Sequence, residues 1–512
     1  MTEQAHPDSD SAGRMEKLMT RQAFARAAVL QRDGKLAEAA TLYEGILRLN
    51  PSHVDALHNL GIIRIQQGRA AEAIGPIGRA VELAPESANP CNDLGMALAL
   101  LHRLEEAAVQ YRKAIAIQPD FIGARSNLAN TLVALKRPDE AITQLEQALA
   151  SRPRSPELHN NLGNALSSLG RHKEAITSYQ AALTIRPDFA EAHNNLGIAL
   201  AALGRPGQAE AHYAQAIALR ADYVDALRNL GKALLTRNRP RLALPHLSHA
   251  LELKPDADAH NDLGNALAML DRHQEAIEQY RQALAKNASF PAAYNNLGNT
   301  LATLGRHAEA VAELRKALAL TPDYPEALSN LGNTLLSLHQ LDEAVQCFER
   351  ALALRPDMAQ AYAGRGGALQ TLGQIEQSRE AIERAIVHAP GNASYYHALC
   401  AVKRFAPGDP HLVAMQALAC GIDTLRPSER VALHFALGKA YADIGEHERA
   451  FHHYADGNAL HRAGIIYDEA FTLAGFDRLK KVFTSDFIRS RDGGGDPPAL
   501  GGVQPLVTPP HG

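Results

Sequence analysis

The stretch PELHNNLGNALSSLGRHKEAITSYQAALTIRPDF occupies residues 156–189, and a variant of it, AEAHNNLGIALAALGRPGQAEAHYAQAIALRADY, follows directly at residues 190–223. The two stretches share the string HNNLG and align without a gap over their whole length. A fixed period of about 34 residues is the signature of a repeat architecture, in which each unit is one supersecondary structure that stacks on its neighbours. This period decides the fold.

The same pattern extends in both directions from residues 156–223. It covers roughly residues 20–391, nearly three quarters of the chain, and only the unit that begins at Val224 is one residue shorter than the others. The eleven units begin near the following residues: Thr20, Val54, Ala88, Ile122, Pro156, Ala190, Val224, Ala257, Pro291, Pro325 and Ala359.

Each unit predicts two amphipathic helices that pack closely. Position 8 is Gly or Ala in every unit, position 20 is Ala except at Ser378, and position 27 is Ala except at Ile46. Small side chains at these positions let two helices approach each other. Position 15 is most often Gly, Asn or Asp, which suit the left-handed residue that ends a helix. We expect His102, Lys136 and His339 to suit that position less well. Proline at position 32 closes the second helix in most units.

The small residues at positions 8, 20 and 27 and the proline at position 32 resemble the tetratricopeptide repeat. The resemblance implies an all-α fold, a right-handed superhelical solenoid of antiparallel helix pairs, with about 11 regular repeats and a divergent C-terminal helical segment. It also implies that positions 2, 5, 6, 9, 12 and 13 of each first helix line a concave groove. This chain departs from the family pattern in having no Trp at position 4 and in replacing the closing proline with Ala221 and Ala288.

The pattern divides the chain into five segments. We expect a disordered N-terminus at residues 1–13, the solenoid at 14–390 and a helical connector at 391–430, with helices at 393–404 and 411–422. A divergent hairpin and a terminal helix are expected at 431–489, with that last helix at 468–483. Residues 490–512 are rich in Gly and Pro and are expected to be disordered.

Asparagine recurs at positions 6 and 9 of the first helices. A separation of i to i+3 places both side chains on one helix face. An amide has donors and an acceptor, so a row of amides is able to bind the backbone of an extended peptide. The row resembles the asparagine ladder of the O-linked N-acetylglucosamine transferase repeats. Local hydrogen bonding is the alternative explanation for the same residues. The candidate groove residues are Asn59, Asn127, Asn130, Asn161, Asn164, Asn195, Asn229, Asn265, Asn296, Asn299, Asn330 and Asn333.

Position 2 carries a row of acids, namely Asp55, Glu157, Glu191, Asp225, Asp258 and Glu326. Two interpretations stand side by side. The acids either give the groove a preference for neutral or basic segments or, as we favour, complement the dipole of the first helix turn.

Three strings near the C-terminus, RFAPGDP, FALGKAYADIG and GNALHR, resemble the junction of bacterial proteins that join such repeats to a sulfotransferase domain. In that family a phosphate-binding loop follows, and no such string occurs in this sequence. The alternative function is therefore the substrate-targeting part of a sulfotransferase, or of an enzyme like O-linked N-acetylglucosamine transferase, whose catalytic part lies outside this chain.

Composition adds few constraints. The net charge of −4 disfavours nucleic acid as a partner, and no membrane span or secretory signal is expected. The four cysteines lack metal-ligand spacing, and we expect reduced, mostly packed thiols in a cytoplasmic protein. We predict no catalytic residues, no metal and no cofactor.

The predicted function is a protein-interaction scaffold that binds an extended partner segment. The sequence leaves the identity of that segment and the oligomeric state open.

Overall fold

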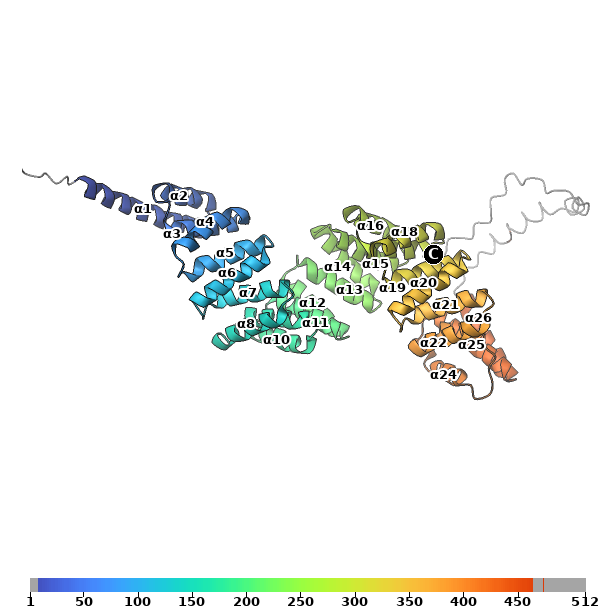
Figure 1. Cartoon of the computed structure of the whole chain (residues 1–512). Coiled ribbons are helices and arrows are strands. Elements are labelled where there is room, and N and C mark those ends of the chain that lie inside the picture. Colours follow the sequence, from blue (N-terminus) through green and yellow to red (C-terminus); the bar gives the residue numbers. More distant parts are fainter. Residues whose placement is uncertain (1–7, 464–472, 474–512) are drawn as a thin grey trace, which may run out of the picture. The chain divides into compact units, whose positions relative to one another are not determined.

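The computed structural model describes residues 8–463 and 473. Across this part of the chain every regular element is a helix, α1–α26 with one short 3-10 helix, η1, and no residue is in a strand. The predicted class, an all-α solenoid of antiparallel helix pairs, is confirmed. Two compact units divide the chain, one ending at Pro255 and the other starting at Asp256. Figure 1 shows the helices following one another as hairpins within each unit.

The first unit contains seven hairpins. Their helices are α1 (Asp8–Arg32), α2 (Leu36–Leu49), α3 (Val54–Gln66), α4 (Ala70–Leu83), α5 (Ala88–Leu100), α6 (Leu104–Ile117), α7 (Ile122–Ala134), α8 (Pro138–Ser151), α9 (Pro156–Ser168), α10 (His172–Ile185), α11 (Ala190–Ala202), α12 (Pro206–Leu219), α13 (Val224–Thr236) and α14 (Pro240–Leu253).

The second unit contains four regular hairpins and a C-terminal segment. Its helices are α15 (Ala257–Ala268), α16 (His273–Lys286), α17 (Pro291–Thr303), α18 (His307–Leu320), α19 (Pro325–Ser337), α20 (Leu341–Leu354), α21 (Ala359–Thr371), α22 (Ile375–His388), α23 (Ala393–Leu399), α24 (Pro410–Ala419), η1 (Ile422–Thr424), α25 (Pro427–Asp443) and α26 (His447–Ala463).

The glycine at position 8 is explained by the side chain at position 24 of the same hairpin. A Cβ atom on Gly197 would lie 2.5 Å from the ring of Tyr213, and one on Gly231 would lie 2.4 Å from Leu247. Both large side chains are buried. Because the two helices close over one large residue, the first helix has room for almost nothing at position 8.

The turn between the two helices is left-handed at position 15 in every regular hairpin, as predicted. Glycine takes this conformation in six hairpins, for example at Gly204 with φ of 71°. His102, Lys136 and His339, which we expected to suit the position less well, adopt the same conformation with φ of 57–58°. The geometry of the turn therefore outweighs the preference of the residue.

Position 4 carries no tryptophan in this chain, and in several hairpins its side chain makes a hydrogen bond to the backbone of the preceding hairpin. The imidazoles of His159 and His193 donate from Nε2 to the carbonyl oxygens of Pro153 and Pro187, at 2.9 and 3.0 Å. Arg125 reaches the equivalent carbonyl of Pro119 at 2.9 Å. The side chain at position 4 thus satisfies the carbonyl oxygen of the proline that closes the preceding hairpin.

The C-terminal helices are shorter than expected. We predicted helices at 393–404 and 411–422, but α23 ends at Leu399 and α24 at Ala419. The chain leaves α23 early because Phe405 is buried at 3% exposure and its N–H donates to Asp443 of α25 at 3.1 Å. The divergent hairpin predicted within 431–489 is present as α25 and α26.

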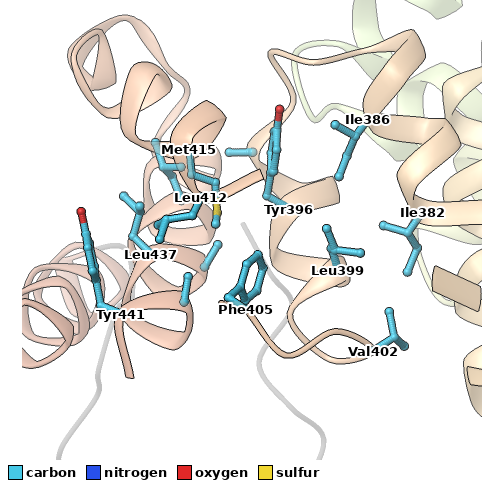
Figure 2. Packing of buried hydrophobic residues seen from close by; sticks show 14 of the residues in the cluster. Ile382, Ile386, Tyr396, Leu399, Val402, Phe405, Leu412, Met415, Leu437 and Tyr441 are labelled. Carbon is cyan, nitrogen blue, oxygen red and sulfur yellow. The ribbon is translucent and has the colours of Figure 1, made fainter. Parts of the chain in front are cut away.

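One hydrophobic cluster joins the last regular hairpin to this C-terminal hairpin. Ile382 and Ile386 of α22 contribute on one side, and Leu437 and Tyr441 of α25 on the other. Figure 2 shows Phe405 among these side chains, with Leu399, Leu412 and Met415 nearby. The divergent segment is therefore packed onto the solenoid through its own core.

The two ends of the chain are only partly described. Helix α1 begins at Asp8, so residues 8–13 are helical where we expected disorder. The predicted helix at 468–483 and the predicted disordered tail at 490–512 lie outside the described residues, apart from Leu473.

Candidate functional site

The first helices of successive hairpins form one face of each unit. Helix α9 contacts both α7 and α11, and α19 contacts both α17 and α21, whereas successive second helices lie further apart. We call the face that these contacting first helices form the inner face of each unit, after the concave side that the resemblance implies.

The asparagines at position 6 bond to the preceding hairpin. In the first unit, Asn195 donates to the side-chain oxygen of Asn160 at 3.1 Å, and Asn229 donates to that of Asn194 at 3.0 Å. Asn127 donates in the same way to Asn92. In each of these pairs the acceptor stands at position 5 of the neighbouring first helix.

The second unit repeats this arrangement. Asn296 donates to Asn261 at 3.0 Å, and Asn330 donates to Asn295 at 2.9 Å. The position 5 acceptors of both units are buried, and Asn194 is only 4% exposed. We call the row of position 5 and position 6 side chains within a unit its amide ladder.

Position 9 asparagines fall into two groups. Asn164 and Asn265 accept from the hydroxyls of Tyr179 and Tyr280, at 2.8 and 2.9 Å. Each of these two asparagines also accepts from the position 6 asparagine of the next hairpin, at 3.1 and 2.9 Å. Burial raises the pKa values of both tyrosines, so their hydroxyls stay protonated and donate. These two asparagines belong to the structural network.

The second group faces solvent. Asn130 and Asn299 are exposed, and Asn333 is half-buried. Within the part of the chain that the structure describes, the side-chain amides of these three residues make no hydrogen bond. Of the twelve predicted groove asparagines, these three remain available to another molecule.

Three of the position 2 acids pair with an arginine at position 31 of the same unit. Glu157, Glu191 and Glu326 accept from Arg186, Arg220 and Arg355 at 2.7, 2.8 and 2.8 Å. Neither of our two interpretations anticipated these ion pairs. They reduce the negative charge of the row, which weakens the expected preference for basic segments.

Family models described as TPR repeat and tetratricopeptide repeat match residues 24–88, 98–164, 163–204, 188–256, 228–289, 289–357 and 335–402. Together they cover most of the helix hairpins described above. The chain is a tetratricopeptide-repeat protein. No curated protein matches it.

Several solved structures resemble this tetratricopeptide protein. YrrB, described as a TPR protein with an unusual peptide-binding site, is 26% identical, with 36% of this chain and 95% of that chain covered and a TM-score of 0.32. Cut9 with Hcn1, from an APC/C hetero-tetramer, is 14% identical, with 86% and 96% covered and a TM-score of 0.44. A tetratricopeptide repeat protein from Parabacteroides merdae is 15% identical, with 48% and 98% covered and a TM-score of 0.43.

The structure distributes the twelve predicted groove asparagines over three environments. Asn127, Asn161, Asn195, Asn229, Asn296 and Asn330 donate along the stack, Asn161 to the hydroxyl of Ser126, and Asn59 donates to the backbone of its own helix. Asn164 and Asn265 accept, and Asn130, Asn299 and Asn333 remain available. The local hydrogen bonding that we kept as an alternative thus engages nine of the twelve.

Sequence reasoning missed the position 5 asparagines as partners of those at position 6. The signal was visible in the Asn-Asn pairs at 160–161, 194–195 and 295–296, and in the Asn-Asp pairs at 92–93 and 261–262. A donor at position 6 and an acceptor at position 5, recurring in several repeats, would join one hairpin to the next.

No group of three His, Cys, Asp or Glu side chains in the described residues is placed to hold a metal ion. All four cysteines are free thiols, with Cys91 and Cys347 buried, Cys400 intermediate and Cys420 exposed. Burial raises the pKa of Cys400 to about 12, which makes this thiol a poor nucleophile. Within the described residues, no helix combines the length and apolar character needed to cross a membrane.

Proposed function

We propose that this protein is a non-catalytic scaffold that holds an extended partner segment along the inner faces of its first helices. The observation that carries the proposal is that the side-chain amides of Asn130, Asn299 and Asn333 make no hydrogen bond, beside an amide ladder that is already satisfied. The ladder fixes the helices on which the available amides stand, so binding would require little reorganisation of the scaffold.

The spacing of these amides suits a peptide backbone. Asn299 and Asn333 stand at the same position of α17 and α19, which contact each other. An extended segment spans about 3.3 Å per residue, so a few residues would pass from one helix to the next. Each amide–backbone bond contributes only about 0.5–1.5 kcal/mol, and affinity must therefore come from several contacts together.

Changing Asn130, Asn299 and Asn333 together to Ala should weaken partner binding at least tenfold while leaving the protein folded. The three amides are not part of the ladder, and Ala favours helix. The partner would first be captured with the full chain and identified by mass spectrometry. Affinities of wild type and variant would then be measured by calorimetry, with melting curves to confirm folding.

A matched control replaces three exposed amides of second helices, Gln180, Gln215 and Gln282, by Ala. This control should bind the partner as wild type does. Equal affinity of the Asn variant and wild type would contradict the proposal and would direct the search to the outer face.

The alternative function, the targeting part of a sulfotransferase, rests on three C-terminal strings. In this structure the RFAPGDP string has a packing role, since it contains the buried Phe405. Asp409 of that string caps α24 by accepting from the N–H of His411 at 2.8 Å. These contacts explain the string without an enzyme.

We expect no saturable binding of an adenosine phosphosulfate donor to this chain. The reason is that its sequence has no phosphate-binding loop of the sulfotransferase type. Isothermal titration of the donor into the full chain checks this expectation. Stoichiometric binding would contradict it and would indicate a donor site within this chain.

A further inference from the structure

Two histidines face each other across the hairpin of α11 and α12. Nδ1 of His193, at position 4, lies 3.1 Å from Nδ1 of His212, at position 23. The ring centroids are 5.4 Å apart and the ring planes differ by 27°, and both residues are half-buried. Two nitrogens at this distance share one proton, because one must donate and the other must accept.

The tautomers of both rings follow from a second contact. Nε2 of His193 lies 3.0 Å from the carbonyl oxygen of Pro187, and a carbonyl only accepts, so this nitrogen carries a hydrogen. In neutral His193 the Nδ1 atom is therefore the acceptor, and Nδ1 of His212 donates to it. A proton added to His212 would occupy its Nε2 atom and leave the pair intact. A proton added to His193 would place two N–H groups against each other.

We propose that this pair is a proton-sensitive latch, which holds the α11–α12 hairpin closed near neutral pH and releases it when both imidazoles become protonated. The folded pair accepts one proton, whereas the unfolded hairpin accepts two. Stability is thus greatest above the ordinary histidine pKa of about 6.5 and falls as the pH drops below it.

Few neighbouring side chains would stabilise a second positive charge on the histidine pair. Burial is the first cause that lowers the pKa of His212, and the positive charge of His193 is the second. The acids of α9, α10, α11 and α12 are bonded to arginines. They are Glu157 of α9 with Arg186, Glu174 of α10 with Arg171, Glu191 of α11 with Arg220 and Glu210 of α12 with Arg237 and Arg239. The remaining charged side chains of α13, at Asp225, Arg228 and Lys232, are not among the causes that shift this pKa.

The latch would act on the amide ladder. Helix α11 carries Asn195, which donates to Asn160, and Asn194, which accepts from Asn229. Release of the α11–α12 hairpin removes two consecutive ladder contacts. Because repeats are stabilised by nearest neighbours, a weakened internal hairpin divides the stack at that point.

The chain contains its own control for the latch. In the α15–α16 hairpin, Nδ1 of His260 lies 2.8 Å from Oε1 of Gln279, again at positions 4 and 23. A Gln side chain has both an amide oxygen that accepts and an NH2 group that donates, so it pairs with Nδ1 of an imidazole whether or not that nitrogen carries a proton. H212Q therefore copies a pairing that the protein already uses and removes the second titrating group.

Hydrogen exchange detected by mass spectrometry tests the latch on the full chain. Labelling at pH 7.5 and pH 5.0, with times scaled for the chemical exchange rate, gives the opening constant of peptides within residues 190–219. We expect that constant to rise on the order of tenfold per pH unit below about pH 6 in wild type. Peptides of α15 and α16 should change far less, and H212Q should suppress the rise.

An equal pH response in wild type and H212Q, or no response in wild type, would overturn the proposal. If H212Q fails to give the wild-type circular dichroism spectrum at pH 7.5, H193Q replaces it, since this variant places the amide on the other helix. The readout involves no partner, so the latch and the proposed scaffold function stand or fail separately.

Discussion

Replacing Gly197 by valine should lower the free energy of unfolding by about 3 kcal/mol, which is near the upper end for overpacking in a core. The Cβ of any larger residue would lie 2.5 Å from the ring of Tyr213, which is 3% exposed. The ring has no free space to move into, because the alanines at positions 20 and 27 of the same hairpin are also fully buried. The hairpin would have to open to admit the side chain.

The other repeats show how large a side chain position 8 accepts. Ala27 stands opposite Tyr43 and Ala129 opposite Leu145, so one methyl group is accommodated in two hairpins, and no unit has a larger residue at position 8. Gly197→Ala should accordingly destabilise the protein less than Gly197→Val, since it adds only that one methyl group and gains helix propensity, although its Cβ also crowds the Tyr213 ring.

Urea unfolding followed by circular dichroism measures these differences. Gly45→Val is the matched control, because Gly45 also lies in a helix but has no atom within 4 Å of an added Cβ. That control should change stability by no more than about 0.5 kcal/mol. A stable Gly197→Val protein would show that the two helices of a hairpin separate more easily than their packing indicates.

The second large effect is expected from the amide ladder. Changing Asn195, Asn229, Asn296 and Asn330 together to Ala should destabilise the protein on the order of 1–3 kcal/mol per position. Each substitution leaves a buried oxygen at position 5, such as that of Asn160 or Asn194, without its donor. A buried acceptor that loses its partner costs more than the hydrogen bond contributes.

A double-mutant cycle on Asn195 and Asn160 separates this cost from other effects. Asn195→Ala alone should lower the free energy of unfolding by more than one hydrogen bond normally contributes. Adding Asn160→Ala should recover part of that loss. The triple variant at Asn130, Asn299 and Asn333 is the control, because it removes amides that do not belong to the ladder. Its melting curve should therefore stay close to that of wild type. Additive effects at Asn195 and Asn160 would argue against a direct bond between them.

The features that sequence predicted well are those fixed within one hairpin. The left-handed turn residue, the buried alanines and the glycine opposite a large side chain all depend on positions inside a single repeat. They follow from helix geometry and side-chain size. Even His102 and His339, which fit the turn less well, could be located because the period of the repeat fixes the position.

Features that depend on contacts between hairpins were harder to predict. Asn195 could be assigned to the inner face, but whether its amide bonds to a partner or to Asn160 depends on the distance between first helices, which composition and period leave undetermined. The pairing of Glu191 with Arg220 is an exception within one repeat, and it was missed because positions 2 and 31 are far apart in sequence. The early end of α23 depends on Asp443, which lies far along the chain from Phe405.

The cluster that joins α22 to α25 has a practical consequence for anyone trimming this protein. A fragment ending at Pro390 would retain all regular repeats, yet it would uncover the face of α22 around Ile386, which the helices after Pro390, beginning with α23, now cover. Terminal repeats of such stacks need a polar outer face to stay soluble. The segment from α23 to α26 thus caps the C-terminal end of the repeat stack. Its removal would expose an apolar surface, and we expect separate molecules to aggregate through that surface.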